Sequence, residues 1–206
     1  MVNLISDTIK FWEYKHRIKD NDSLSGCGYD ETIDFLKIRD CINIGCNVLE
    51  IGVGLGYVTN GLYENGANVS AVDISDLALS NVAKYCEKIY NVKELSNLPT
   101  NYYDVIICNN VVQHVPTDLL IEELKEIMRS LKDDGILAIE FVSSDTFEDN
   151  GLNPTLENIQ TGRLCRKPNF IENIIKTFGD KCKLVFDRKI DVFIIKGHHV
   201  FHVRKK

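Results

Sequence analysis

Short apolar runs alternate with helically spaced apolar residues along most of this chain. The runs are rich in β-branched residues, as buried strands are, and cover residues 48–51, 67–72, 104–108 and 136–142. The predicted helices cover residues 58–63, 75–89, 118–131 and 168–178, with Ser75 and Thr117 expected as N-caps of the second and third. Such strand–helix alternation predicts a mostly parallel sheet with helices on both faces.

Both ends of the chain add elements to this alternating core. Apolar and aromatic residues among charges predict an amphipathic helix over Ile5–Ile18, and a short helix is expected around Glu31–Arg39. Residues 183–186 and 200–203 alternate in polarity and predict an antiparallel strand pair. The expected fold is therefore α/β, a three-layer sandwich whose mostly parallel, seven-stranded sheet ends in that antiparallel C-terminal pair.

The composition fits a single compact enzyme domain over residues 1–206. Hydrophobic residues make up 44% of the chain and charged residues 26%, as in ordinary globular proteins. The formal net charge of -6 argues against a dedicated nucleic-acid binder, whose domain carries a basic footprint. We expect residues 41–206 to form the alternating core and residues 1–40 to precede it as a helical segment.

The cysteines and the N-terminal segment predict a cytoplasmic protein. The seven cysteines are odd in number, scattered, and form no Cys-x-x-Cys pair, so neither a disulfide framework nor a zinc site is expected. The first residues lack a basic leader followed by an apolar run, and no stretch reaches about 18 consecutive apolar residues. No membrane segment is therefore expected.

The most informative stretch is a predicted strand that runs into a glycine-rich turn and then a helix. The carboxylate Glu50 lies at the strand end, and glycines follow at Gly52, Gly54 and Gly56. Because glycine has no Cβ and tolerates positive φ, such a turn lets backbone approach a ligand closely. A dinucleotide-binding fingerprint requires Gly or Ala at position 57 and no acid before the loop. Tyr57 and Glu50 therefore favour a cationic ligand over a pyrophosphate.

A second carboxylate, Asp73, ends the next predicted strand. It follows the glycine turn by about 20 residues, the spacing at which an acid accepts the hydroxyls of a ribose. An alternative is that Asp73 only stabilises the start of the helix at Ser75 through the helix dipole. Together with the glycine turn, the spacing favours the ribose interpretation.

The pattern acid-x-Gly-x-Gly-x-Gly resembles the first motif of class I S-adenosylmethionine (SAM)-dependent methyltransferases, and the resemblance extends over nearly the whole chain from Asn47 onward. Residues 94–99 resemble the segment that flanks the adenine, with Glu94 in place of the commoner Asp. Residues 103–115 resemble the fourth-strand motif, and residues 131–137 the turn before the fifth strand. The resemblance implies that SAM is the cofactor and S-adenosylhomocysteine (SAH) the product. The cofactor-binding residues that it implies are Trp12, Glu50, Gly52, Val53, Gly54, Gly56, Tyr57, Asp73, Ile74, Glu94, Leu95, Asn109, Asn110 and Val111.

Methyl transfer to a hydroxyl or ammonium group also requires removal of a proton. His114 follows the fourth predicted strand and is the best-placed base, since histidine titrates near neutrality. The alternative is that His114 only begins the next helix or packs beside the adenine. Tyr14 and Tyr29 are further candidates to orient or deprotonate the acceptor.

Substrate contacts are expected from the segments outside the core. The resemblance to small-molecule methyltransferases implies that residues 1–40 form a helical lid over a SAM-binding core of residues 41–206. The N-terminal helix carries Tyr14 and His16, and Tyr29 follows it, so these residues are predicted to contact the acceptor beneath the lid. Arg163 and Arg166 lie in a long polar segment and could pair with a phosphate or carboxylate, or be solvated surface charges. No pair of carboxylates suited to Mg²⁺ follows the fourth strand, which favours a metal-independent reaction.

We therefore predict a SAM-dependent methyltransferase acting on oxygen or nitrogen of a small, phosphorylated or sugar-type metabolite. The partner is a small-molecule acceptor rather than nucleic acid or membrane, and the protein is expected to be a monomer or homodimer. One alternative is a catalytically silent SAM-binding subunit that serves as a partner or regulator. Another is a nicotinamide-dependent oxidoreductase, which Glu50 and Tyr57 disfavour.

Overall fold

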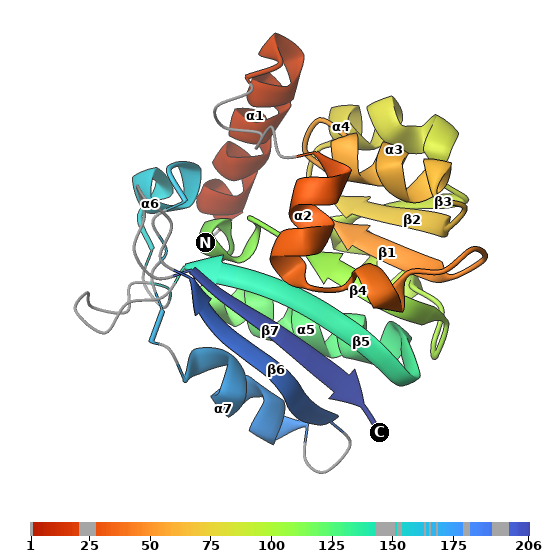
Figure 1. The fold of residues 1–206 in the computed structure, drawn as a ribbon. Helices are drawn as coiled ribbons and strands as arrows, with labels where there is room; N and C mark the ends of the chain where they lie inside the picture. Colours follow the sequence, from red (N-terminus) through yellow and green to blue (C-terminus); the bar gives the residue numbers. More distant parts are fainter. Residues whose placement is uncertain are drawn as a thin grey trace.

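The computed structural model describes residues 2–20, 28–142, 151, 154–162, 164, 166–167, 169–178, 182–190 and 198–206. Within these residues the protein is built around a seven-stranded sheet of order β3-β2-β1-β4-β5-β7-β6 (Figure 1). The pairs β1–β2, β1–β4, β2–β3 and β4–β5 are parallel, and β7 is antiparallel to both β5 and β6. The predicted fold class is confirmed. The strands are β1 (Asn47–Ile51), β2 (Asn68–Asp73), β3 (Lys88–Asn91), β4 (Tyr103–Cys108), β5 (Leu131–Val142), β6 (Cys182–Ile190) and β7 (His198–Lys205).

Helices cover both faces of the sheet, because successive side chains of each buried strand point to opposite sides. Val48 in β1 packs with the cluster that includes Ile33 and Leu62, whereas Leu49 packs with the cluster of Leu124 and Ile174 on the other face. None of the helices in the described ranges is long and apolar enough to span a lipid bilayer. The helices are α1 (Val2–Ile18), α2 (Tyr29–Leu36), α3 (Tyr57–Glu64), α4 (Asp76–Val82), α5 (Thr117–Ser130), α6 (Leu156–Gln160) and α7 (Phe170–Thr177). Short 3-10 turns are η1 (Arg39–Cys41), η2 (Ala83–Tyr85), η3 (Val92–Asn97) and η4 (Val112–His114).

The two N-terminal helices differ in position: α2 packs on a face of the sheet, and α1 lies outside the helix layers. Ile33 and Leu36 in α2 are fully buried against the sheet face. Figure 1 shows α1 and α6 beyond the ends toward which β1, β4 and β5 run. Of the described residues in the predicted lid over 1–40, α2 is therefore a core helix, and α1 is placed to cover a site at the carboxyl ends of the strands.

Two local predictions were wrong. The helix expected to reach residue 89 ends at Val82, and the chain then forms η2 and the strand β3. Lys88 and Ile89 in β3 are exposed, so this edge strand lacks the apolar run that marks the central strands. Thr117 is the first residue of α5 rather than its N-cap, because Pro116 takes the capping position without a side-chain bond. The Ser75 cap is confirmed, since its Oγ accepts the Ala78 N–H.

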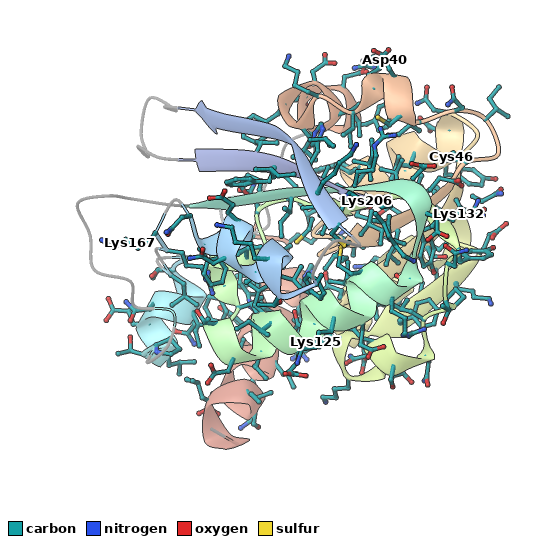
Figure 2. The ribbon with its side chains drawn as sticks, turned by 90° about the horizontal axis from the view of Figure 1, so that it is seen from below. Asp40, Cys46, Lys125, Lys132, Lys167 and Lys206 are labelled. Carbon is teal, nitrogen blue, oxygen red and sulfur yellow. The ribbon has the colours of Figure 1, made fainter. Side chains whose placement is uncertain are left out.

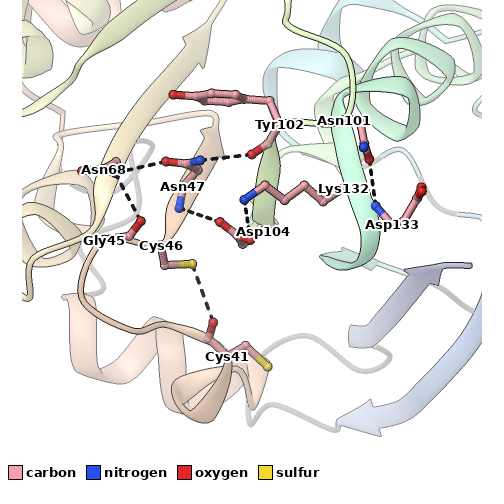
Figure 3. A network of polar contacts seen from close by, with 10 residues as sticks. All are labelled: Cys41, Gly45, Cys46, Asn47, Asn68, Asn101, Tyr102, Asp104, Lys132 and Asp133. Atoms are coloured by element: carbon pink, nitrogen blue, oxygen red, sulfur yellow. Dashed lines mark hydrogen bonds and ion pairs between the residues drawn. The ribbon is translucent and has the colours of Figure 1, made fainter.

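A polar network ties the strands together at the end of the sheet opposite the glycine-rich loop (Figure 3). The Asp104 carboxylate accepts the Asn47 N–H at 2.9 Å and pairs with Lys132 Nζ at 2.8 Å, linking β4 to β1 and β5. The Asn68 amide donates to Asn47 Oδ1, which links β2 to β1. Figure 2 shows Cys46 and Lys132 close together at this end. The network therefore supports the register of β2, β1, β4 and β5.

Candidate active site

The glycine-rich loop leaves β1 and enters α3 through three glycines with positive φ. The φ angles are 77° at Gly52, 52° at Gly54 and 83° at Gly56, a region that side chains with a Cβ rarely adopt. A Cβ at Gly52 would lie 2.2 Å from Val111 Cγ2, in the segment that follows β4. The loop therefore needs glycine both for its turns and for its close approach to the end of β4.

A cavity opens between this loop, α2 and the carboxyl ends of β1 and β4. Glu50 lies in its wall and is only 4% exposed. The Thr59 hydroxyl donates to Glu50 Oε2 at 2.6 Å. Burial raises the pKa of Glu50 to about 8, against the opposing effect of the Thr59 hydrogen bond. The residues that line the cavity are Thr32, Glu50, Ile51, Gly52, Val53, Gly54, Leu55, Tyr57, Val58, Ile107 and Asn109.

Two further oxygens in this cavity are buried without a hydrogen bond. Thr32 Oγ1 and Asn109 Oδ1 have no partner among the described residues. A buried acceptor without a donor is costly, about 1–3 kcal/mol, and is most readily satisfied by a ligand or ordered water. With the Glu50 carboxyl, they form a set of acceptors suited to a ligand with several N–H donors and a positive charge. The sequence did not indicate Thr32, which lies on α2 outside any recognised motif.

Asp73 is held between the loop and α4. Its carboxylate accepts the N–H of Val53 and the N–H of Ser75, both at 2.9 Å. Burial raises the pKa of Asp73 to about 6, although these backbone hydrogen bonds oppose the shift. The contact with the start of α4, which was the alternative to ribose binding, is thus present. Since each carboxylate oxygen has two lone pairs, ribose contact stays a prediction alongside it.

The segment predicted to flank the adenine forms η3. Glu94 Oε2 accepts the Asn91 N–H at 3.1 Å in a capping box, and the Leu95 side chain is buried in the core. Asn91 also donates to the carbonyl of Ile74 at 3.3 Å, which joins η3 to the end of β2. The Glu94, Leu95 and Ile74 assignments are compatible with this arrangement and stay predictions.

Asn110 turns the chain sharply after β4. Its φ is 57°, its N–H donates to Glu140 Oε2 at 2.8 Å, and its side-chain oxygen accepts from Gln113 at 3.3 Å. The cavity wall thus contains Asn109 but not Asn110. Glu140, fully buried in β5, was missed by the sequence analysis. The sequence signal that could have identified Glu140 is that it is the single carboxylate in the otherwise apolar run 136–142.

His114 lies at the end of η4, near the carboxyl ends of β4 and β5. Its Nδ1 is 2.6 Å from the carbonyl oxygen of Ile159. The indole ring of Trp12 meets the imidazole edge-on, with ring centroids 4.8 Å apart. Burial lowers the pKa of His114, while the Ile159 contact and the charge of Glu140 act in the opposite direction. The imidazole is therefore favoured in its neutral form.

The other predicted residues of α1 lie differently from expectation. Trp12, predicted to bind the cofactor, contacts His114 and is not in the wall of the Glu50 cavity. His16 is buried, and burial lowers its pKa despite the nearby charge of Glu13. Tyr14 is 55% exposed and has no place in the cavity wall. The structure gives no support to a catalytic role for Tyr14.

Tyr29 has a packing role at the start of α2. A Cβ at Gly61 in α3 would lie 2.2 Å from Tyr29 Cβ, so the two helices meet closely at this point. The Arg39 guanidinium lies 6.0 Å from the Tyr29 ring centroid, and burial raises the pKa of the phenol. Tyr29 therefore joins α2 to α3 and does not line the cavity as an acceptor-orienting residue.

The structure gives no support to the prediction that Arg166 binds an anionic substrate. Its side chain is fully buried and donates to the carbonyl of Val112 at 2.7 Å and to that of Val115. The guanidinium is thus engaged by backbone within the protein. Arg163 lies outside the described residues. In the parts of the chain that the structure describes, no cluster of three or more His, Cys, Asp or Glu side chains could hold a metal ion.

Comparisons with known proteins agree with this fold and loop. The ubiquinone biosynthesis O-methyltransferase of Schizosaccharomyces pombe, named as mitochondrial, is 31% identical over 126 residues, which cover 55% of this chain and 44% of that protein. A SAM-dependent methyltransferase structure from Archaeoglobus fulgidus has a TM-score of 0.63 at 17% identity, covering 92% of this chain and 99% of that one. The 1,6-didemethyltoxoflavin-N1-methyltransferase of Burkholderia thailandensis, with bound SAH, has a TM-score of 0.66 at 17% identity, covering 98% and 87%.

The sheet order and the glycine-rich loop at the end of β1 define the class I SAM-dependent methyltransferase fold. Residues 49–139 match the family described as Methyltransferase domain, and this match implies SAM as the cofactor. The chain spans less than half the length of the curated relatives that it matches.

Proposed function

We propose that this protein transfers the methyl group of SAM to an oxygen atom of a small molecule and releases SAH. The observation that carries the proposal is the cavity beside the glycine-rich loop, where Glu50, Thr32 and Asn109 present buried acceptor oxygens to a cationic ligand. Oxygen is the favoured acceptor atom because the S. pombe relative and three bacterial relatives are named O-methyltransferases. We also propose a metal-independent reaction, because Asn109 and Asn110 stand where β4 ends.

The residues of this chain would contribute a base and an oriented, water-poor site. When bound, SAM supplies an electrophilic methyl group on a positively charged sulfur. His114 is favoured as neutral, and its Nε2 would accept the hydroxyl proton of the acceptor as the acceptor oxygen attacks the methyl carbon. Trp12 and the rest of α1 would exclude water beside His114. Much of the rate enhancement would come from holding donor and acceptor in line.

The acceptor is proposed to be a small molecule, but the prediction that this molecule is phosphorylated or anionic loses support. It rested on Arg163 and Arg166, and the Arg166 guanidinium is engaged by the carbonyls of η4. An uncharged hydroxyl compound is the better first candidate. Acceptors should therefore be screened from neutral phenols and alcohols first, with phosphorylated and sugar-type metabolites as a second set.

The first test is a calorimetric titration of the purified protein with SAH, with NADH as the control. We expect SAH to bind in the micromolar range and NADH to show no heat of binding. Failure of SAH to bind, both alone and with candidate acceptors present, would overturn the methyltransferase proposal. SAH binding without turnover of any acceptor from either screening set would instead favour a silent SAM-binding subunit.

Replacement of the candidate base tests the proton-transfer step. His114→Ala should lower the turnover number by about 10²–10⁴-fold, the usual contribution of general acid–base catalysis, with less than about a threefold change in SAH affinity. Single-turnover kinetics and SAH titration measure the two effects separately. A parallel fall in turnover and SAH affinity would show that His114 is a cofactor-pocket residue and not the base.

A further inference from the structure

Ile159, Gly162, Leu164 and Arg166 contact His114 or the residues beside it in η4. The carbonyl of Ile159 lies 2.6 Å from Nδ1, and Gly162 packs against the imidazole ring. The Leu164 N–H donates to the carbonyl of Gln113 at 3.2 Å. Arg166 then donates to η4 from within the protein. A segment about 50 residues further along the chain thus supports the turn that carries the candidate base.

The Ile159 contact determines which imidazole nitrogen carries the proton. A backbone carbonyl oxygen can only accept a hydrogen bond, so Nδ1 of a neutral His114 must be the protonated nitrogen. Nε2 is then the nitrogen with the free lone pair, which is the form that a general base requires. In hydrolases with a catalytic triad a carboxylate sets the tautomer in the same way.

Arg166 holds the turn on which His114 lies. Its two terminal nitrogens donate to the carbonyls of Val112 and Val115, which flank Gln113 and His114 in the chain. The guanidinium also lies 5.0 Å from the Phe170 ring centroid. Because the guanidinium fork is planar and rigid, it sets the separation of the two carbonyls, and with it the geometry of η4.

Gly162 leaves room beside the reactive nitrogen. Its φ is 64°, and a Cβ there would lie 2.8 Å from His114 Cε1 and 3.0 Å from Nε2. Only glycine combines this backbone conformation with an open space at the lone pair of Nε2. The same Cβ would lie 3.2 Å from Gln113 Cγ.

We propose that Arg166 and the carbonyl of Ile159 are positioning groups for His114, which hold its imidazole as the Nδ1–H tautomer with Nε2 free to accept a proton. Arg166 is thus a positioning residue that acts through η4, and Gly162 keeps the lone pair accessible. This inference rests on the proposed function, in which His114 is the base. The tautomer itself is a property of the protein without cofactor or acceptor.

Nitrogen-15 NMR of the imidazole side chains at about pH 8, where histidines are neutral, tests the proposal directly. His114→Ala assigns the resonances of His114. In the wild type we expect a protonated Nδ1 and an unprotonated Nε2 for His114. His202 provides an internal comparison with the opposite tautomer, because its Nε2 contacts the carbonyl of Leu36 at 2.6 Å.

Two variants separate positioning from simple structural support. Gly162→Ala should push the ring from Ile159 and give a mixture of both tautomers, and Arg166→Lys should do so partially, because one ammonium cannot replace the two-pronged contact. Both should lower the turnover number by at least about tenfold and leave SAH affinity within about threefold. Arg129→Lys is the matched control for the NMR readout, since Arg129 also donates to two backbone carbonyls, of Leu95 and Ser96.

A wild-type His114 protonated on Nε2 would overturn the proposal, and so would an unchanged tautomer in both folded variants. If Arg166→Lys does not fold, Gly162→Ala alone decides the outcome. Failure of the proposed function is distinguishable, because SAH would then not bind although the NMR signature of His114 is present.

Discussion

Gly54→Val is expected to abolish SAH binding, with at least a hundredfold, or about 3 kcal/mol, loss of affinity. Gly54 lies in the wall of the cavity, so valine methyl groups would occupy ligand space between the loop and β4. Its φ of 52° also disfavours a β-branched side chain, which should cost about 1–3 kcal/mol of stability. Calorimetric titration with SAH measures the first effect and thermal unfolding the second.

Gly45→Val is the matched control for this substitution. Gly45 has a φ of 79°, and a Cβ there would meet no atom within 4 Å. It lies before β1 at the opposite end of the strand, in the network of Figure 3. The control should show a comparable loss of stability with unchanged SAH affinity. If folded Gly54→Val bound SAH as tightly as the control does, the loop would not be the cofactor site.

Glu50→Gln is expected to make the protein more stable and a weaker ligand binder. Burial raises the pKa of Glu50 from 4.5 to about 8. A shift of this size lowers the free energy of unfolding by about 5 kcal/mol above about pH 8, where the carboxyl is ionised in the folded and the unfolded states. Glutamine has the same shape, retains an oxygen for the Thr59 hydroxyl, and has no such pH-dependent cost. SAH affinity should fall by ten- to a hundredfold, because glutamine cannot ionise to become a charged acceptor for the ligand's ammonium group.

The sign of the pH dependence follows from the raised pKa. Below about pH 4.5 Glu50 is protonated in both the folded and unfolded states, so the substitution has little effect on stability. Between about pH 4.5 and 8 the unfolded state has lost this proton while the folded state keeps it, so wild-type stability falls as the pH rises. The advantage of Glu50→Gln should therefore grow through this window and level off above about pH 8.

Urea unfolding at several pH values, with and without SAH, measures both effects. Glu122→Gln, which changes an exposed glutamate paired with Lys125 on α5, is the control and should change stability by less than about 0.5 kcal/mol. A Glu50→Gln protein that is less stable than the wild type at about pH 8 would show that the carboxylate is compensated by interactions other than the Thr59 hydrogen bond.

The fold was largely predictable because its signals are local. Apolar runs marked β1, β2, β4 and β5, which are buried on both faces, and alternation marked the C-terminal pair β6 and β7. The strand β3 was missed because it lies at the sheet edge, where Lys88 and Ile89 face solvent and no apolar pattern is required. The same reasoning explains why residues 83–89 were read as the end of a helix.

The cofactor side of the site was predictable for a related reason. Glu50 and the three glycines are adjacent in sequence, and their spacing alone predicts a close backbone approach to a ligand. Other residues of the site come from distant segments, and no spacing rule connects them. Thr32 reaches the cavity from α2 and Glu140 reaches Asn110 from β5, which only the folded chain brings together.

Local sequence patterns by themselves determined the class of fold, the glycine-rich loop and the strand ends at which a ligand binds, because periodicity and backbone conformation are properties of neighbouring residues. Tertiary structure decided the electrostatics and the use of individual side chains. It buried Glu50 and raised its pKa, directed Arg166 to the carbonyls of η4, and left Tyr14 in solvent. Burial and partner choice depend on which surfaces meet, so no single segment of the sequence contains that information.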